Sequence, residues 1–200
     1  SRDGTAEAAR TWAAAAPRAA TVEVLPLLGP PDSGRALRAL LEAARALGAA
    51  ACAFTQADLL GITPRWMGRL LGPILADQAD VVLPAYTRPI GEGTLTTNVL
   101  APLARALFGR RIQQVLGGCG AIAGRHVSVL LADPIRDEGL GPQGIACWIP
   151  VEAMAAGRRI VEAPLGEKRP AAARVPPDLP GILVQTVGPL FRFMDRYAEA

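Results

Sequence analysis

Residues 49–58, AAACAFTQAD, join a continuous apolar run to an acidic residue. The apolar part, from Ala49 to Phe54, is typical of a β-strand in the middle of a sheet, covered on both faces. Asp58 follows closely after the end of that strand. Ligands of open α/β sheets bind beyond the carboxyl ends of the strands. This stretch therefore predicts a buried central strand whose end borders a binding site.

Helical and strand-like segments alternate on both sides of this stretch. Before it, apolar residues recur at helical spacing from Arg35 to Leu47, and Gly48 ends that helix. After it, Thr63 is an N-cap and Pro64 is the first residue of a second helix. Further strands are expected at 21–25, 79–86 and 159–164, and further helices at 4–16, 97–108, 125 onward and 150–156. This alternation predicts an α/β fold with a largely parallel central sheet flanked by helices.

The C-terminal part differs in composition from the rest. Several prolines occur within 170–180, and the last twenty residues carry apolar side chains at helical spacing. We therefore expect one α/β domain at 1–169, followed at 170–200 by a Pro-rich linker and an amphipathic helix. That helix would pack on its own domain or pair with a second copy to form a homodimer. Because Ser1 begins inside a motif-like stretch, we expect that the first strand of the domain is missing.

Composition excludes several function classes. Half of the 200 residues are apolar, and the net charge is +3 with a pI near 9.1, but the arginines are scattered and form no tract of the kind that binds nucleic acid. Three cysteines are too few and too irregular for a disulfide framework or a zinc site, which favours a cytoplasmic protein with reduced thiols. No apolar run is long enough to span a membrane.

A series of short motifs carries a resemblance to a known family. In chain order they are Asp3-Gly4-Thr5-Ala6-Glu7, residues 54–64 with Trp66, 79–82, 86–88, 93–98, 102–103, 117–118 and 163–166. Together they resemble the family-2-like GT-A glycosyltransferases, and within these the mannosylglycerate and glucosyl-phosphoglycerate synthases. The resemblance extends over nearly the whole chain, with the motifs in the same order.

The resemblance implies a GT-A-type nucleotide-binding sandwich that transfers a sugar from a nucleotide-diphospho-sugar to a small, anionic acceptor. It places Asp3, Gly34, Gln56 and Asp58 against the nucleotide-sugar, and Asp58 as the ligand of a divalent cation, Mg²⁺ or Mn²⁺. Judged from the residues alone, Asp58 would equally serve to cap the turn that follows it.

The resemblance also implies an acceptor site, made of residues that follow later strands: Arg88, Thr94, Thr96, Asn98, Gly117 and Gly118. Arg88 follows a strand end, and its guanidinium fork suits a carboxylate or phosphate. Without the resemblance, Arg88 would equally be a surface arginine. The threonines and Asn98 would equally cap the helix that begins there.

Several positions depart from the family pattern. The Asp-x-Asp pair that holds the metal is here Gln56-Ala57-Asp58, and an amide is a poorer ligand for a hard cation. The histidine expected after the Leu165-Gly166 motif is absent, and Cys119 stands where relatives carry an acidic residue. We interpret Cys119 as a buried, unreactive thiol and the sole histidine, His126, as a surface or capping residue. No catalytic residue is assigned. The alternative hypothesis is a catalytically degenerate domain that binds nucleotide, sugar or a protein partner without turnover.

Overall fold

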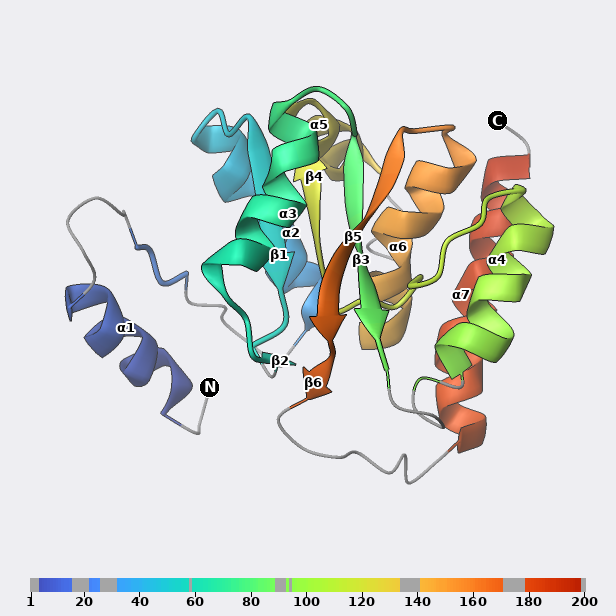
Figure 1. The fold of residues 1–200 in the computed structure, drawn as a ribbon, viewed down its shortest axis with the longest axis horizontal. Helices are drawn as coiled ribbons and strands as arrows, with labels where there is room; N and C mark the ends of the chain where they lie inside the picture. Colours follow the sequence, from blue (N-terminus) through green and yellow to red (C-terminus); the bar gives the residue numbers. More distant parts are fainter. Residues whose placement is uncertain are drawn as a thin grey trace.

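The computed structural model describes residues 4–15, 22–25, 32–57, 59–88, 93, 95–133, 141–170 and 179–198. Within them, the helices are α1 (Thr5–Ala15), α2 (Ser33–Ala46), α3 (Pro64–Leu75), the π-helix η1 (Thr96–Leu100), α4 (Ala101–Phe108), α5 (Gly124–Ala132), α6 (Gly141–Ala155) and α7 (Leu179–Ala198). The strands are β1 (Ala51–Thr55), β2 (Leu59–Leu60), β3 (Val81–Thr87), β4 (Cys119–Ala123), β5 (Ile160–Glu167) and β6 (Arg169–Pro170). Figure 1 shows the main sheet at the centre, with helices on both of its faces.

The main sheet has the strand order β1-β4-β3-β5, and a second small sheet pairs β2 with β6. Only β3 and β5 pair in parallel, because β4 runs antiparallel to both of its neighbours. The α/β class is confirmed, and β1, β3 and β5 point the same way, but the sheet is partly antiparallel because β4 is reversed. The reversed direction of β4 follows from residues 109–118, which run back along the sheet after α4. As a result, β4 begins at the end of the sheet where β3 ends (Figure 1).

β1 also differs in part from its prediction. It is the terminal strand of the described sheet and pairs only with β4 there, so its predicted central position is wrong. Both of its faces are nevertheless packed. Ala51 and Ala53 lie against the α3 side, and Cys52 and Phe54 against the opposite core. The apolar run thus reflects coverage of both faces.

Two apolar cores hold the sheet between its helices. On one face, Trp66, Leu70 and Ile74 of α3 pack on small residues of the strands, among them Ala121 and Ala123. Successive residues of a strand point to opposite faces, so the neighbouring Ile122 lies in the other core. The alanines of β4 thus let α3 approach the sheet closely.

The second core lies beneath α2, α5, α6 and α7. Trp148 of α6 is its largest fully buried side chain, and Leu190 and Phe193 of α7 are also buried in it. The C-terminal amphipathic helix therefore packs on the α/β domain. Among the described residues, none of the helices combines the length and the apolar character needed to cross a bilayer.

A cluster of charges ties three elements together at the end of the sheet where β3 and β5 begin. Asp80 accepts hydrogen bonds from the backbone N of Arg159 at 3.0 Å and from Nε of Arg125 at 3.0 Å. Asp77 accepts from the same two arginines, at 2.8 and 3.0 Å. The hydrogen bonds from Arg159, followed by those from Arg125, hold the pKa of the Asp80 carboxyl well below its usual range.

We expect Asp80→Asn to lower the free energy of unfolding by about 2 kcal/mol at pH 7, because charge-assisted hydrogen bonds are lost. Folding lowers the pKa of Asp80, so its stabilisation is fully present above the ordinary value of about 4 and decreases as the pH falls below it. Urea unfolding at pH 7 and pH 3 should show the difference between wild type and variant shrinking at pH 3. Glu42→Gln, which breaks the exposed Arg38–Glu42 pair of α2, is the control with little effect. An equal difference at both pH values would contradict this account.

Candidate functional site

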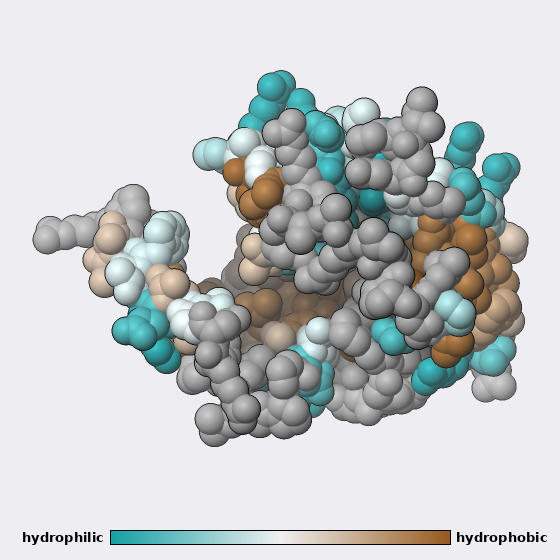
Figure 2. All heavy atoms as spheres, turned by 90° about the horizontal axis from the view of Figure 1, so that it is seen from below, coloured by the Kyte–Doolittle hydropathy of each residue, from teal (hydrophilic) through white to brown (hydrophobic). Residues whose placement is uncertain are grey.

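The carboxyl ends of β1, β3 and β5 meet the amino end of β4 at the lower edge of the sheet in Figure 1. Residues from all four strand ends therefore converge there: Gln56 after β1, Tyr86 and Arg88 at the end of β3, Gly117 and Gly118 before β4, and Lys168 after β5. We call this group the lower-edge site. Figure 2 views the molecule from below, and the described residues visible near the centre of this face are mainly apolar.

Gly118 forms the centre of the site. The backbone N of Gln56 donates to the Gly118 carbonyl at 2.8 Å, which joins the end of β1 to the turn before β4. Gly118 has φ +75°, a conformation that favours glycine. A Cβ on Gly118 would lie 2.5 Å from Oε1 of Gln56 and 3.5 Å from Nζ of Lys168. The missing side chain therefore leaves room in which an amide and an ammonium come together.

Gly117 has a different role. A Cβ at this position would overlap the ring of Pro84, which lies in the middle of β3. Its carbonyl accepts a hydrogen bond from Nζ of Lys168 at 3.3 Å. The glycine pair thus allows the turn to pass close to β3 and also helps to place the lysine.

The positively charged groups of Lys168 and Arg88 both lie over the ring of Tyr86. Its ring centroid is 5.4 Å from Nζ of Lys168 and 5.8 Å from Cζ of Arg88, within the range of cation–π attraction. Its hydroxyl is 2.9 Å from Sγ of Cys119, with either atom as donor. Burial, followed by the contact with Cys119, raises the pKa of Tyr86. The phenol is therefore neutral at physiological pH and serves to position its neighbours.

Cys119 is buried, as predicted. Burial raises the pKa of its thiol, although the Tyr86 hydroxyl and the Lys168 charge act in the opposite direction. A raised pKa keeps the thiol protonated, and a protonated thiol is a poor nucleophile. The prediction that Cys119 is buried is thus confirmed, and its raised pKa supports the interpretation that it is unreactive.

Arg88 is fixed in its orientation by the segment before β4. Its Nη2 donates to Oε1 of the buried Gln114 at 2.7 Å. Its side chain also passes Gly93, where a Cβ would lie 2.7 Å from Cδ of Arg88. Gly93 in turn accepts a hydrogen bond from the backbone N of Thr97, which joins the Arg88 side chain to the start of η1.

The structure brings together four of the residues predicted for binding: Gln56, Arg88, Gly117 and Gly118. Thr96 and Asn98 lie on η1, Thr96 buried and Asn98 exposed. Gly34 lies in the first turn of α2, where its backbone N donates to the capping carboxylate of Asp32. Asp3, Asp58 and Thr94 lie outside the described residues, so their assignments stay predictions.

Sequence reasoning missed three members of the lower-edge site. Tyr86 lies in one of the family motifs but has no predicted role there, and Gln114 and Lys168 lie in none of these motifs. For Lys168 a weak signal is present, since it lies four residues after the strand predicted at 159–164. His126 was interpreted wrongly, because it is 2% exposed and its Nε2 lies 2.8 Å from a carboxylate oxygen of the buried Glu152.

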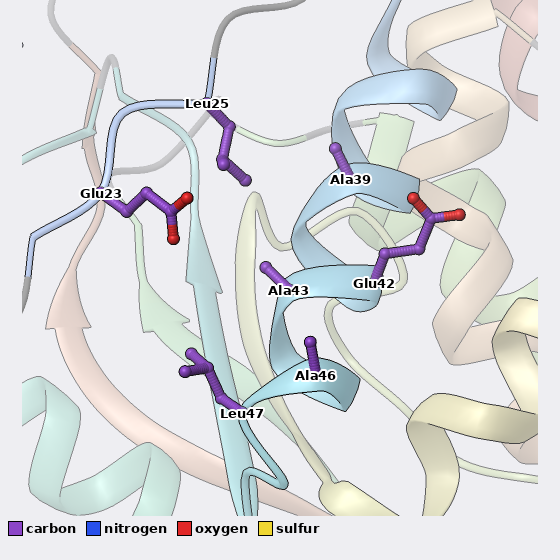
Figure 3. A pocket seen from close by; sticks show the side chains of 7 residues that line it. All are labelled: Glu23, Leu25, Ala39, Glu42, Ala43, Ala46 and Leu47. Atoms are coloured by element: carbon purple, nitrogen blue, oxygen red, sulfur yellow. The ribbon is translucent and has the colours of Figure 1, made fainter.

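A separate hollow of about 480 Å³ lies between residues 22–25 and α2. Figure 3 shows Glu23 and Leu25 on one side of it and Ala39, Ala43 and Ala46 of α2 on the other. Its charged lining residues, Glu23 and Glu42, are both carboxylates. This hollow suits an anionic nucleotide poorly, so we place the candidate site at the lower edge of the sheet instead.

No protein-family model matches the chain, and no curated protein matches its sequence significantly. Solved structures do match it. Glucosyl-3-phosphoglycerate synthase from Mycobacterium tuberculosis, in complex with Mn²⁺, uridine diphosphate and phosphoglyceric acid, matches with TM-score 0.63 and 20% identity over 85% of this chain and 56% of that one. With Mg²⁺ and uridine diphosphate, the same enzyme matches with TM-score 0.62 and 20% identity over 86% and 57% of the two chains. The chain has a GT-A glycosyltransferase fold.

A further structure, of a mycobacterial protein, matches with TM-score 0.61 and 23% identity over 86% of this chain and 54% of that one. The chain therefore spans a little over half the length of the solved structures that it matches. At these identities the likeness establishes the GT-A fold, and the predicted resemblance is confirmed at that level.

The described residues at the lower edge of this GT-A fold do not by themselves make a site for a divalent cation, and Asp58, the predicted metal ligand, lies outside them. Mg²⁺ and Mn²⁺ prefer several oxygen ligands, carboxylates above all. Among the described residues, no three His, Cys, Asp or Glu side chains gather in a group that would hold a metal ion. At the turn itself, an amide, Gln56, and an ammonium, Lys168, both lie close to Gly118.

Proposed function

We propose that the lower-edge site binds a nucleotide-diphospho-sugar and transfers the sugar to a small anionic acceptor. The observation that carries the proposal is the convergence of Gln56, Arg88 and Lys168 around the Gly117-Gly118 turn in a GT-A fold. All three side chains can donate hydrogen bonds to phosphate or carboxylate oxygens. The glucosyl-3-phosphoglycerate synthase structures, solved with uridine diphosphate and phosphoglyceric acid, support this assignment by analogy of fold.

In the proposed reaction the bond between the anomeric carbon and the diphosphate oxygen breaks, and the nucleoside diphosphate leaves with the electron pair. The acceptor hydroxyl oxygen forms the new bond and releases its proton. The site would contribute by orienting the two substrates and by stabilising negative charge on the leaving diphosphate. Gln56 and the Gly118 turn would face the diphosphate, and Arg88 would face the acceptor.

Arg88 is suited to the acceptor because Gln114 and Tyr86 hold its guanidinium in place. A positioned guanidinium binds a carboxylate or phosphate more strongly than a mobile one, since less side-chain entropy is lost. The preference of the site for an anionic acceptor thus depends on Arg88. We expect this preference to be lost when Arg88 is replaced.

The test is to incubate the full chain with isotopically labelled UDP-glucose or GDP-mannose and 3-phosphoglycerate, and to detect the glycosylated acceptor by mass spectrometry. We expect a product, and we expect Arg88→Gln to raise the KM for 3-phosphoglycerate about tenfold or more, because one charge-assisted contact is lost. The KM of the Arg88→Lys variant should lie between those of the wild type and of Arg88→Gln. Arg105→Gln, which removes an exposed charge of α4, is the matched control.

The second candidate is a domain that binds the nucleotide-sugar without turnover, and Gln56 in place of a carboxylate favours it. Nucleotide-sugar binding by calorimetry without any product would support this candidate. Absence of both binding and product would contradict both candidates.

A further inference from the structure

Helix α7 buries one face in the core and exposes the other. Leu190 and Phe193 are fully buried, whereas Val184 is 71% exposed and Phe191 is 45% exposed. We infer that the exposed face of α7 binds a second copy of this chain, with the two α7 helices antiparallel about a two-fold axis. Such a dimer does not depend on the proposed sugar transfer.

The position of α7 leaves this face open to a partner. The helix runs along one end of the molecule, beside α4 (Figure 1). Seen from below, apolar side chains gather at the same end (Figure 2). Contiguous exposed apolar surface marks interaction sites, whereas single exposed apolar residues do not. The end of the molecule that α4 and α7 form is therefore a candidate interface.

The exposed face has a shape that fits a copy of itself. Val184, Gly188, Phe191 and Asp195 share one side of the helix, since they follow one another at intervals of three or four residues. A Cβ at Gly188 would meet no atom within 4 Å, so the face is open at this position. When the two-fold axis passes between Gly188 and Phe191, each Phe191 ring lies against Gly188 of the other copy. This is the reciprocal contact of a two-fold interface.

The polar residues beside this face are complementary about the same axis. Gln185 and Asp195 lie at nearly equal distances along the helix on either side of it, so each Asp195 carboxylate faces the Gln185 amide of the other copy. The amide N–H donates to the carboxylate, and the amide oxygen accepts from Arg192. All three side chains are exposed, and within the described part of the chain none has a hydrogen bond or an ion pair.

This pattern favours a second copy over a partner of a single charge. A basic partner would meet the like charge of Arg192, and an acidic partner would meet that of Asp195. A second copy instead supplies a donor for each acceptor and an acceptor for each donor. The self-complementary pattern thus identifies the occupant.

The first test is sedimentation velocity of the full chain at increasing concentration. We expect a species of twice the chain mass of 20.8 kDa. Gly188→Gln fills the open position and Phe191→Gln removes the ring, so each should raise the dissociation constant of the dimer by about tenfold or more. Leu75→Gln replaces an apolar side chain of α3 that is 65% exposed, and should leave the dimer unchanged. Circular dichroism of each variant verifies that it is folded.

The second test is a compensating pair of substitutions. Asp195→Arg places a guanidinium beside Arg192 and should weaken the dimer about tenfold, because like charges then meet across the interface. Adding Gln185→Glu to this variant should restore most of the affinity, because a carboxylate then faces the introduced guanidinium. Such a recovery requires that positions 185 and 195 face each other across the two copies.

The outcomes decide the proposal without any nucleotide or acceptor. A wild-type chain that stays monomeric up to about 1 mM would overturn it. A dimer that Gly188→Gln and Phe191→Gln leave intact would overturn it as well, because its interface would lie elsewhere. A dimer that these two variants weaken, that Leu75→Gln leaves unchanged, and that the compensating pair restores would support it.

Discussion

Replacing Trp148 with alanine should lower the free energy of unfolding by about 4 kcal/mol. Trp148 is 1% exposed and is the largest fully buried side chain of the core between the sheet and α7. The substitution removes its transfer free energy and leaves a cavity that the surrounding helices fill only in part. Urea unfolding followed by circular dichroism measures the change.

Two further variants separate the causes. Trp148→Phe keeps most of the ring but loses the hydrogen bond that Nε1 donates to Asp133 at 3.1 Å, so we expect a smaller loss of about 1–2 kcal/mol. Trp12 is 64% exposed on α1, and Trp12→Ala should change the stability by no more than about 0.5 kcal/mol. Equal losses for Trp148→Ala and Trp12→Ala would refute the described packing of α6.

The second large effect is expected for Gly124→Ala, at about 3 kcal/mol of lost stability. Gly124 begins α5 directly after β4, and its backbone N donates to the Ala50 carbonyl at 2.8 Å. A Cβ there would overlap the Ala49 carbonyl oxygen and lie 3.0 Å from the Ala49 carbonyl carbon. Because these atoms are backbone, β1 and β4 would have to move apart.

Gly68→Ala is the matched control, since a Cβ there, in the middle of α3, meets no atom within 4 Å. It should raise the stability by up to about 1 kcal/mol, as alanine favours the helix. Thermal unfolding of the two variants should shift in opposite directions. A Gly124→Ala protein as stable as wild type would show that β1 does not approach α5 as described.

Several elements of the fold were predictable from local sequence signals. Thr63 and Pro64 start α3, and Gly109 ends α4 with φ +66°. Pro150 misled the prediction, because proline favours the first turn of a helix, whereas here it lies inside α6. Residues 22–25 were expected to be part of a strand and form none. Local signals thus identified helix ends better than they identified the extent of an element.

The arrangement of the strands was less predictable. The apolar run before Thr55 correctly indicated two covered faces, yet it could not show whether a strand edge is paired. The reversed direction of β4 depends on the path of residues 109–118, in which only Gly109 and the Gly117-Gly118 pair gave a sequence signal. Sheet topology is determined by such long connections, which carry little pattern.

The candidate site was predictable in its glycines and in Arg88, since these follow or precede strand ends. Its chemistry was not. That Lys168 meets Gly117, and that Arg88 meets Gln114, depends on contacts between residues far apart in the sequence.

The central claim is that a nucleoside diphosphate binds at the lower edge of the sheet, and a crystal structure of the chain with UDP or GDP tests it most directly. We predict a diphosphate oxygen within hydrogen-bond distance of Nζ of Lys168, beside Gln56 and Gly118. A nucleotide bound instead between residues 22–25 and α2, with Lys168 far from the phosphates, would contradict the account.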